Sequence, residues 1–299
     1  MLPTAPPDPL APEQQAELRR WRTLDFLPAE EDHSSYRSPS RLAAIGACGR
    51  SGTTLLRRML GGHSQLADAP ESFLFLPVPI QTDDLAARFG LDPALVHDLL
   101  RQSASRAAFI DAFQSAYLAL RQRRIWVDKT SRNVHCFAAI LRHFPQARLI
   151  HVIRDPRDVV CSLRTHPLIR KGDPERRPTG WIQPWQDCID RWRLSIDDGL
   201  RLRGHPAYCE VRYEDLVHNS EAVLRSLCDF LGVAFEPQML LFHQRPEPTN
   251  LRFIPNNRNA TLPLSDRSIG RWRQELGPPE LALVEQQLGS YLPLLGYST

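Results

Sequence analysis

Short apolar runs alternate with longer amphipathic stretches from residue 41 onward. Four runs are almost continuously apolar, as strands buried on both faces of a parallel sheet are: Leu42–Ala47, Arg124–Val127, Arg148–Ile153 and Tyr208–Arg212. Helical patterns lie between them: Thr53–Gly61, Asp92–Arg123 with a break near Ala104–Arg106, Asn133–Phe144, Arg157–Thr165 and Trp181–Arg203. Strands separated by helices predict an α/β fold, with a central parallel sheet flanked by helices.

The α/β pattern begins only after residue 40, so we expect residues 1–40 to form an N-terminal extension and linker. Residues 41–299 are the right length for a single domain. A candidate helix over Ala11–Trp21 falls within the extension. Two stretches rich in proline and polar residues, Thr165–Pro184 and Gln244–Leu264, predict long irregular loops. Because long loops in compact domains are usually functional or disordered, we expect the first of them, with the extension, to shape a substrate site.

Composition narrows the class of protein. A net charge of +3 argues against a general nucleic-acid surface, and 42% hydrophobic residues are typical of a soluble globular chain. Residues 1–10 are proline-rich and lack the basic and apolar regions of a signal peptide, and no apolar run is long enough to span a membrane. The six cysteines form no C-x-x-C pair. We therefore expect a cytoplasmic protein with reduced thiols and no metal site.

A polar, glycine-containing turn joins the first predicted strand to the first helix. It contains Gly49, Arg50, Ser51, Gly52, Thr53 and Thr54. A strand, such a turn and a helix N-terminus form an anion cradle, because backbone N–H groups point inward and the helix dipole adds positive charge. A Walker A loop needs G-x-x-x-x-G-K-[ST], whereas Ala47 occupies the first glycine position and Thr53 the lysine position. The turn thus predicts a phosphate cradle that is not built for Mg-ATP.

Polar residues also follow the other three strands. Lys129 follows the second strand and Arg154 the third, with Ser162 about two helical turns beyond Arg154; Tyr213 follows the fourth strand. The carboxyl ends of parallel strands meet at one sheet edge, where ligands bind in such folds. This set of side chains fits a ligand that carries two separated anionic groups and an aromatic base.

Two of these segments resemble motifs of sulfotransferases that use 3′-phosphoadenosine 5′-phosphosulfate (PAPS). Gly49–Thr54 resembles their 5′-phosphosulfate loop, and Ile150–Asp158 with Ser162 resembles their 3′-phosphate motif. The resemblance extends from Arg41 to Trp272 and implies a P-loop-like fold. Within the superfamily the chain is most similar to the tyrosylprotein-type and related bacterial enzymes, which carry R-S-G-T-T in the loop.

The resemblance implies roles for individual residues. Glu71 lies at the same distance from the loop arginine as that branch's catalytic base, although Ala69-Pro70-Glu71 replaces its Gly-Glu-Glu. Lys129 matches the lysine that contacts the transferring sulfuryl group. Tyr213 matches a tyrosine that contacts the nucleotide. Arg271 matches a cationic residue that contacts PAPS and is lysine in the tyrosylprotein enzymes. The resemblance implies that PAPS also contacts residues 49–54, Arg154 and Ser162. No metal is expected.

Sulfuryl transfer to an acceptor hydroxyl needs a base, which contributes roughly 10²–10⁴-fold to the rate, and donors for the developing charge. Should Glu71 not be that base, His63 is the next candidate. Two alternatives stay open: a nucleotide or small-molecule kinase, against which the missing lysine after Gly52 argues, and a non-catalytic nucleotide-binding module. The acceptor class (small molecule, sugar, lipid or peptide tyrosine) and the oligomeric state also stay open.

Overall fold

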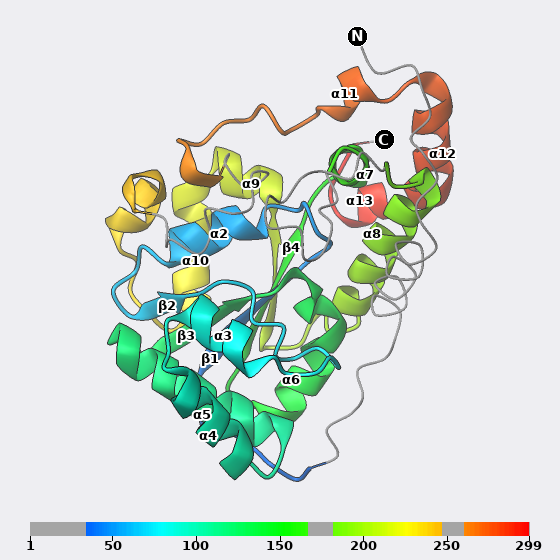
Figure 1. The fold of residues 1–299 in the computed structure, drawn as a ribbon. Coiled ribbons are helices and arrows are strands. Elements are labelled where there is room, and N and C mark those ends of the chain that lie inside the picture. Colours follow the sequence, from blue (N-terminus) through cyan, green and yellow to red (C-terminus); the bar gives the residue numbers. More distant parts are fainter. Residues whose placement is uncertain (1–33, 167–181, 247–259, 299) are drawn as a thin grey trace.

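A computed structural model describes residues 34–166, 182–246 and 260–298 of the chain. Its centre is a five-stranded sheet in the order β2-β3-β1-β4-β5 (Figure 1). The strands are β1 (Leu42–Gly46), β2 (Leu66–Asp68), β3 (Ile125–Lys129), β4 (Arg148–Ile153) and β5 (Tyr208–Arg212). Neighbouring strands all pair in parallel, so their carboxyl ends share one edge.

Helices connect successive strands. Those before β4 are α2 (Thr53–Leu60), α3 (Thr82–Phe89), α4 (Pro93–Gln102), α5 (Arg106–Arg121), the 3₁₀ helix η1 (Ser131–Cys136) and α6 (Phe137–His143). Those after β4 are α7 (Pro156–Arg164), α8 (Trp185–Leu200), α9 (Tyr213–His218), α10 (Ser220–Leu231), the 3₁₀ helix η2 (Pro237–Gln244), α11 (Trp272–Glu275), α12 (Pro278–Leu288) and α13 (Tyr291–Leu294).

The sheet is buried on both faces because alternate residues of its strands enter different apolar clusters. In β1, Leu42 and Ala44 pack with α3 to α6 around Trp126. Ala43 and Ile45 pack instead with α2, α10 and η2. A third cluster around Trp192 joins α7, α8, α12 and α13. The sequence prediction of a parallel α/β sheet flanked by helices is therefore confirmed.

Several element boundaries differ from those predicted. The helix predicted over 133–144 is α-helical only from Phe137, because residues 133–136 belong to the 3₁₀ turn η1, in which the side-chain Nδ2 of Asn133 donates to Asp128 Oδ2 at 2.8 Å. Helix α8 begins at Trp185, directly after Pro184, because proline cannot donate inside a helix. Strand β2 has only three residues and was not predicted. Residues 1–33 of the predicted extension, with the candidate helix over 11–21, lie outside the described residues, as do most of both predicted loops.

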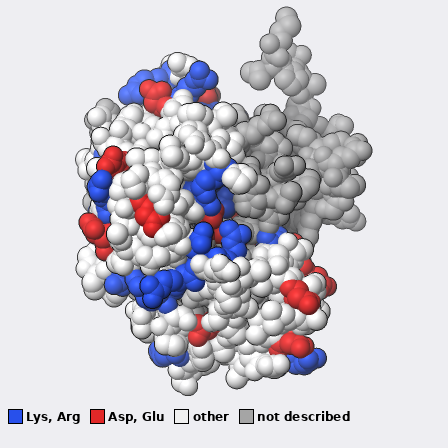
Figure 2. Space-filling view, turned by 90° about the vertical axis from the view of Figure 1, so that its left-hand side faces the viewer, with Lys and Arg blue, Asp and Glu red and all other residues white. Residues whose placement is uncertain are grey.

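On the face shown in Figure 2, acidic and basic side chains are interspersed, and basic ones gather near its centre. Among the described residues, none of the helices is both long and apolar enough to cross a membrane.

Candidate active site

The predicted cradle is the turn between β1 and α2. Arg50 has a φ of 73° and Gly52 a φ of 93°, so the backbone passes twice through the left-handed region. Glycine is required at the second position, because a Cβ there would lie 2.3 Å from the Tyr213 ring. The turn is anchored at both ends to Ser131, whose carbonyl accepts from Ala47 N at 2.7 Å and whose hydroxyl lies 3.2 Å from Thr53 Oγ1.

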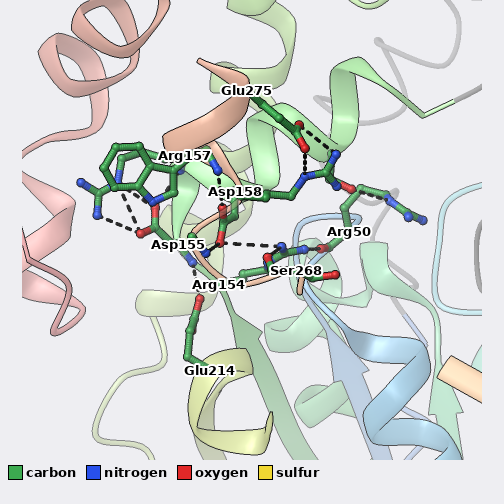
Figure 3. Close-up of polar contacts among 12 residues, drawn as sticks. Arg50, Arg154, Asp155, Arg157, Asp158, Glu214, Ser268 and Glu275 are labelled. Atoms are coloured by element: carbon green, nitrogen blue, oxygen red, sulfur yellow. Dashed lines mark hydrogen bonds and ion pairs between the residues drawn. The ribbon is translucent and has the colours of Figure 1, made fainter. Parts of the chain in front are cut away.

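Three arginines from separate segments converge beside this turn, and we call them the arginine cluster: Arg50, Arg154 and Arg271. Arg50 Nε donates to Ser162 Oγ on α7 at 3.2 Å, and Arg154 Nη1 donates to the Arg50 carbonyl at 2.9 Å (Figure 3). Burial, followed by repulsion from Arg154 and Arg271, lowers the pKa of Arg50 to about 10. Accumulated positive charge of this kind is suited to an anionic ligand.

Arg154 is held on several sides. Its Nη2 donates to the carbonyl of Ser268 and lies 3.8 Å from Asp158 Oδ2, while its guanidinium carbon lies 4.7 Å from the centre of the Tyr213 ring. Its Nε is buried and has no hydrogen-bond partner among the described residues. A buried, unpaired donor on an arginine fits a phosphate oxygen as its missing partner.

Asp158, which the sequence analysis did not single out, orders the segment that carries Arg271. Its two carboxylate oxygens accept from Gly270 N at 2.8 Å and Trp272 N at 3.1 Å. Arg271 forms a two-pronged ion pair with Glu275, at 2.7 and 2.8 Å. Its place four residues after Arg154, within the predicted 3′-phosphate motif, was the sequence signal that could have identified Asp158.

The two predicted catalytic residues lie side by side. Lys129 ends β3 and Glu71 follows β2; Lys129 Nζ donates to Glu71 Oε1 at 2.8 Å. The lysine side chain is 8% exposed and the glutamate side chain 31%. Burial acts to raise the pKa of the Glu71 carboxyl, but the charge and hydrogen bond of Lys129 outweigh it, so the pKa lies below its usual value. The pair is thus an ammonium beside an ionised carboxylate.

Hydrogen bonds from two side chains to the backbone fix the residues around Glu71. Thr130 Oγ1 accepts from Ser72 N at 3.1 Å and from Phe73 N at 3.3 Å, and Phe73 has a φ of 58°. Arg88 donates to the Glu71 carbonyl and lies over the Phe73 ring at 5.5 Å. Sequence reasoning missed Thr130 and Arg88 as supports of Glu71. Thr130 directly follows Lys129, whereas the position of Arg88 gave no signal.

The remaining predicted residues occupy the same sheet edge or are buried beneath it. Tyr213 is buried, and its ring contacts Gly52 and Arg154. His63 is 1% exposed; its Nδ1 accepts from Gln65 N at 2.9 Å, so its Nε2 donates to the Ala234 carbonyl at 2.8 Å. Both of its nitrogens are therefore occupied by the backbone, which makes it a poor substitute for Glu71 as base.

Comparison with known proteins agrees with the geometry. A sequence model of the sulfotransferase family matches residues 43–237. Protein-tyrosine sulfotransferase 2 of Gallus gallus is 22% identical over 295 residues, covering 94% of this chain and 76% of that protein. The chain spans between 57% and 76% of the lengths of the first curated relatives it matches.

Two solved structures resemble the chain. The sulfotransferase domain of the Synechococcus PCC 7002 olefin synthase has a TM-score of 0.62 and 26% identity, covering 90% of this chain and 99% of that one. A mouse sulfotransferase, SULT7A1, solved in complex with PAP, has a TM-score of 0.50 and 11% identity, covering 91% and 87%. The second likeness concerns the fold alone. The match of the family model over most of the described domain shows that this chain belongs to the sulfotransferase family, whose enzymes transfer sulfuryl groups.

Proposed function

We propose that the chain transfers a sulfuryl group from PAPS to an acceptor hydroxyl, with Glu71 as general base. One observation carries the proposal: the cradle is hydrogen-bonded to helix α7 beside the arginine cluster on one side and to the segment that follows Lys129 on the other. On one side Arg50 reaches Ser162, and on the other Thr53 contacts Ser131, two residues beyond Lys129. An enzyme that binds a nucleotide and deprotonates a hydroxyl needs its anion-binding residues and its acid–base residues at the same sheet edge.

The donor would bind along the cradle. Backbone N–H groups of residues 49–54 would hold the 5′-phosphosulfate, while Arg154, Ser162 and Arg271 would hold the 3′-phosphate, and Tyr213 would support the nucleotide. The unpaired Nε of Arg154 and the lowered pKa of Arg50 both fit an anion at this place. The PAP bound in the mouse sulfotransferase supports the same class of donor.

PAPS supplies a sulfuryl group on a phosphate leaving group. The acceptor oxygen attacks sulfur as the sulfur–phosphate oxygen bond breaks, and the Glu71 carboxylate takes the hydroxyl proton. Lys129, with the backbone donors of the cradle, balances charge on the departing oxygen; removing one such donor typically costs about 10²–10³-fold in rate. Once Lys129 is drawn toward the phosphosulfate of PAPS, its charge and hydrogen bond no longer lower the pKa of Glu71, so this pKa rises and the carboxylate becomes a stronger base.

Calorimetric titration of 3′,5′-adenosine bisphosphate, with Mg-ATP as the control, tests the donor assignment. We expect the bisphosphate to bind without magnesium and ATP to bind much more weakly. Binding of Mg-ATP alone would favour a kinase, and binding of neither nucleotide would contradict the assignment of the cradle. Nucleotide binding without sulfuryl transfer from PAPS to any alcohol, phenol, sugar or tyrosine peptide would instead favour a non-catalytic module.

A further inference from the structure

The peptide group that joins Arg154 to Asp155 is held from both sides. Its carbonyl oxygen accepts from the Trp192 indole at 3.1 Å, and its N–H donates to Glu214 Oε1 at 3.0 Å. Figure 3 shows the Glu214 carboxylate, which comes from α9, directed at this peptide beside Arg154. Since the Cα of Arg154 belongs to this peptide plane, the two bonds limit where its guanidinium can point.

Glu214 is itself held by a residue far away in the sequence. Its Oε2 accepts from the Tyr297 hydroxyl at 2.9 Å, and Tyr297 is only 8% exposed. The Tyr297 ring lies under the guanidinium of Arg212, at 4.4 Å. Gly296, with a φ of 75°, turns the backbone immediately before the tyrosine. The carboxylate of Glu214 therefore has one oxygen for the Asp155 peptide and the other for Tyr297.

We propose that Tyr297 is a positioning residue for the donor's 3′-phosphate, acting through Glu214 on the Arg154–Asp155 peptide. The proposal rests on the proposed function, because it assigns the 3′-phosphate to Arg154. Without the Tyr297 hydroxyl, Glu214 Oε2 becomes a buried acceptor without that partner, which is costly. The carboxylate must then rotate or take up a proton, and burial already raises its pKa. Either change loosens the peptide that aims Arg154.

The chain offers a matched control. The Tyr291 hydroxyl also donates to a carboxylate, Asp197 Oδ1, at 2.8 Å, and its ring packs edge-on against Trp192. Tyr291→Phe and Tyr297→Phe therefore remove the same kind of hydrogen bond from the same region while keeping each ring. Only Tyr297 is joined through Glu214 to the peptide that follows Arg154.

The test compares two nucleotides on wild type and both variants by calorimetry. 3′,5′-Adenosine bisphosphate carries the 3′-phosphate and 5′-AMP lacks it. The Kd of 5′-AMP divided by that of the bisphosphate therefore isolates the contribution of the 3′-phosphate. We expect Tyr297→Phe to raise the Kd of the bisphosphate about tenfold, equivalent to about 1.4 kcal/mol, and that of 5′-AMP less than about twofold. Tyr291→Phe should leave both Kd values within about twofold of wild type.

Equal weakening of both nucleotides by Tyr297→Phe would mean a merely structural role and would overturn the proposal, as would behaviour identical to Tyr291→Phe. If Tyr297→Phe fails to fold, Glu214→Ala decides, because it removes the acceptor of the Asp155 N–H and leaves Arg154 itself in place. If the Kd of 5′-AMP divided by that of the bisphosphate is unchanged in Glu214→Ala, the proposal is overturned, and a smaller quotient supports it. A wild-type protein that does not discriminate between the two nucleotides would contradict the proposed function itself.

Discussion

The arginine cluster and the Glu71–Lys129 pair lie at the same sheet edge, yet they are built in opposite ways. In the cluster, like charges are brought together: Arg154 contacts the Arg50 carbonyl, and burial together with the charges of Arg154 and Arg271 lowers the pKa of Arg50. In the pair, opposite charges meet at 2.8 Å, and the glutamate side chain keeps 31% of its exposure. The cluster gathers cations beside the cradle, with Asp158 and Glu275 near two of them, whereas the pair joins one cation to one anion.

Under the proposed function, this difference assigns nucleotide binding to the cluster and chemistry to the pair. A preassembled set of cations gains from an anionic ligand without having to rearrange, which favours affinity. A neutral pair has to be separated before its carboxylate can take a proton, so its contribution is realised during the reaction. Substitutions in the cluster should therefore act mainly on nucleotide binding, and substitutions in the pair mainly on turnover.

The largest effect is expected from Glu71→Gln. The amide keeps the shape of the side chain but cannot take up the acceptor's proton, so kcat should fall by about 1,000-fold. Affinity for 3′,5′-adenosine bisphosphate should stay near that of wild type. Steady-state rates with PAPS and calorimetry measure the two quantities separately. Glu236→Gln is the matched control, because that carboxylate accepts from Ser64 instead; full activity in Glu71→Gln would show that another group is the base.

The next largest effect is expected from Lys129→Met, with a fall in kcat of about 300-fold. It also changes the pH profile. Glu71 acts as a carboxylate, so the rate falls as the pH drops through its pKa, which Lys129 holds below the usual value. Without the ammonium this pKa rises, and the acidic limb of the kcat/KM profile, which reports the free enzyme, moves to higher pH. An acidic limb that stays in place would contradict the coupling between the two residues.

Much of the fold and of the two regions could be predicted from the sequence, because the patterns that indicate them are local. The apolar runs of β1, β4 and β5 and the turn at 49–54 are contiguous, so strand and cradle follow from neighbouring residues. Strand β2 was missed because three residues show no recognisable period. The pairing of Glu71 with Lys129 rests on adjacent strands, and the family resemblance pointed to both residues.

The supports of the site could not be predicted in the same way. Arg88 reaches Glu71 from α3, and Tyr297 reaches Glu214 across 83 positions. An arginine on a helix or a tyrosine near a turn has the same local sequence whether it faces solvent or hydrogen-bonds to a distant segment of the site. Which partner it finds depends on how the layers pack, and that information is not contained in any short window of the sequence.

Arg154→Ala should act on binding rather than turnover. It removes a buried guanidinium that also orders the cradle through the Arg50 carbonyl, so the Kd of 3′,5′-adenosine bisphosphate should rise by about 100-fold, or about 2.7 kcal/mol. The Kd of 5′-AMP should rise less. Arg148→Ala, at the opposite end of β4, removes a hydrogen bond to the Phe230 carbonyl and serves as the control. A large loss of kcat at saturating PAPS with unchanged Kd would reverse the roles assigned to the two regions.

The smallest effect is expected from Ser162→Ala. Ser162 Oγ accepts from Arg50 Nε at 3.2 Å, so its hydroxyl both orients Arg50 and faces the region assigned to the 3′-phosphate. Losing one such hydrogen bond should weaken the bisphosphate about fivefold and leave 5′-AMP almost unchanged. Ser220→Ala removes a buried hydroxyl that donates to the Leu216 carbonyl and to no residue of the cluster, and should change neither Kd. If Ser162→Ala binds both nucleotides as wild type does, the 3′-phosphate contacts are limited to the arginines. If only kcat falls, the cluster takes part in the chemistry and the two regions are not separate.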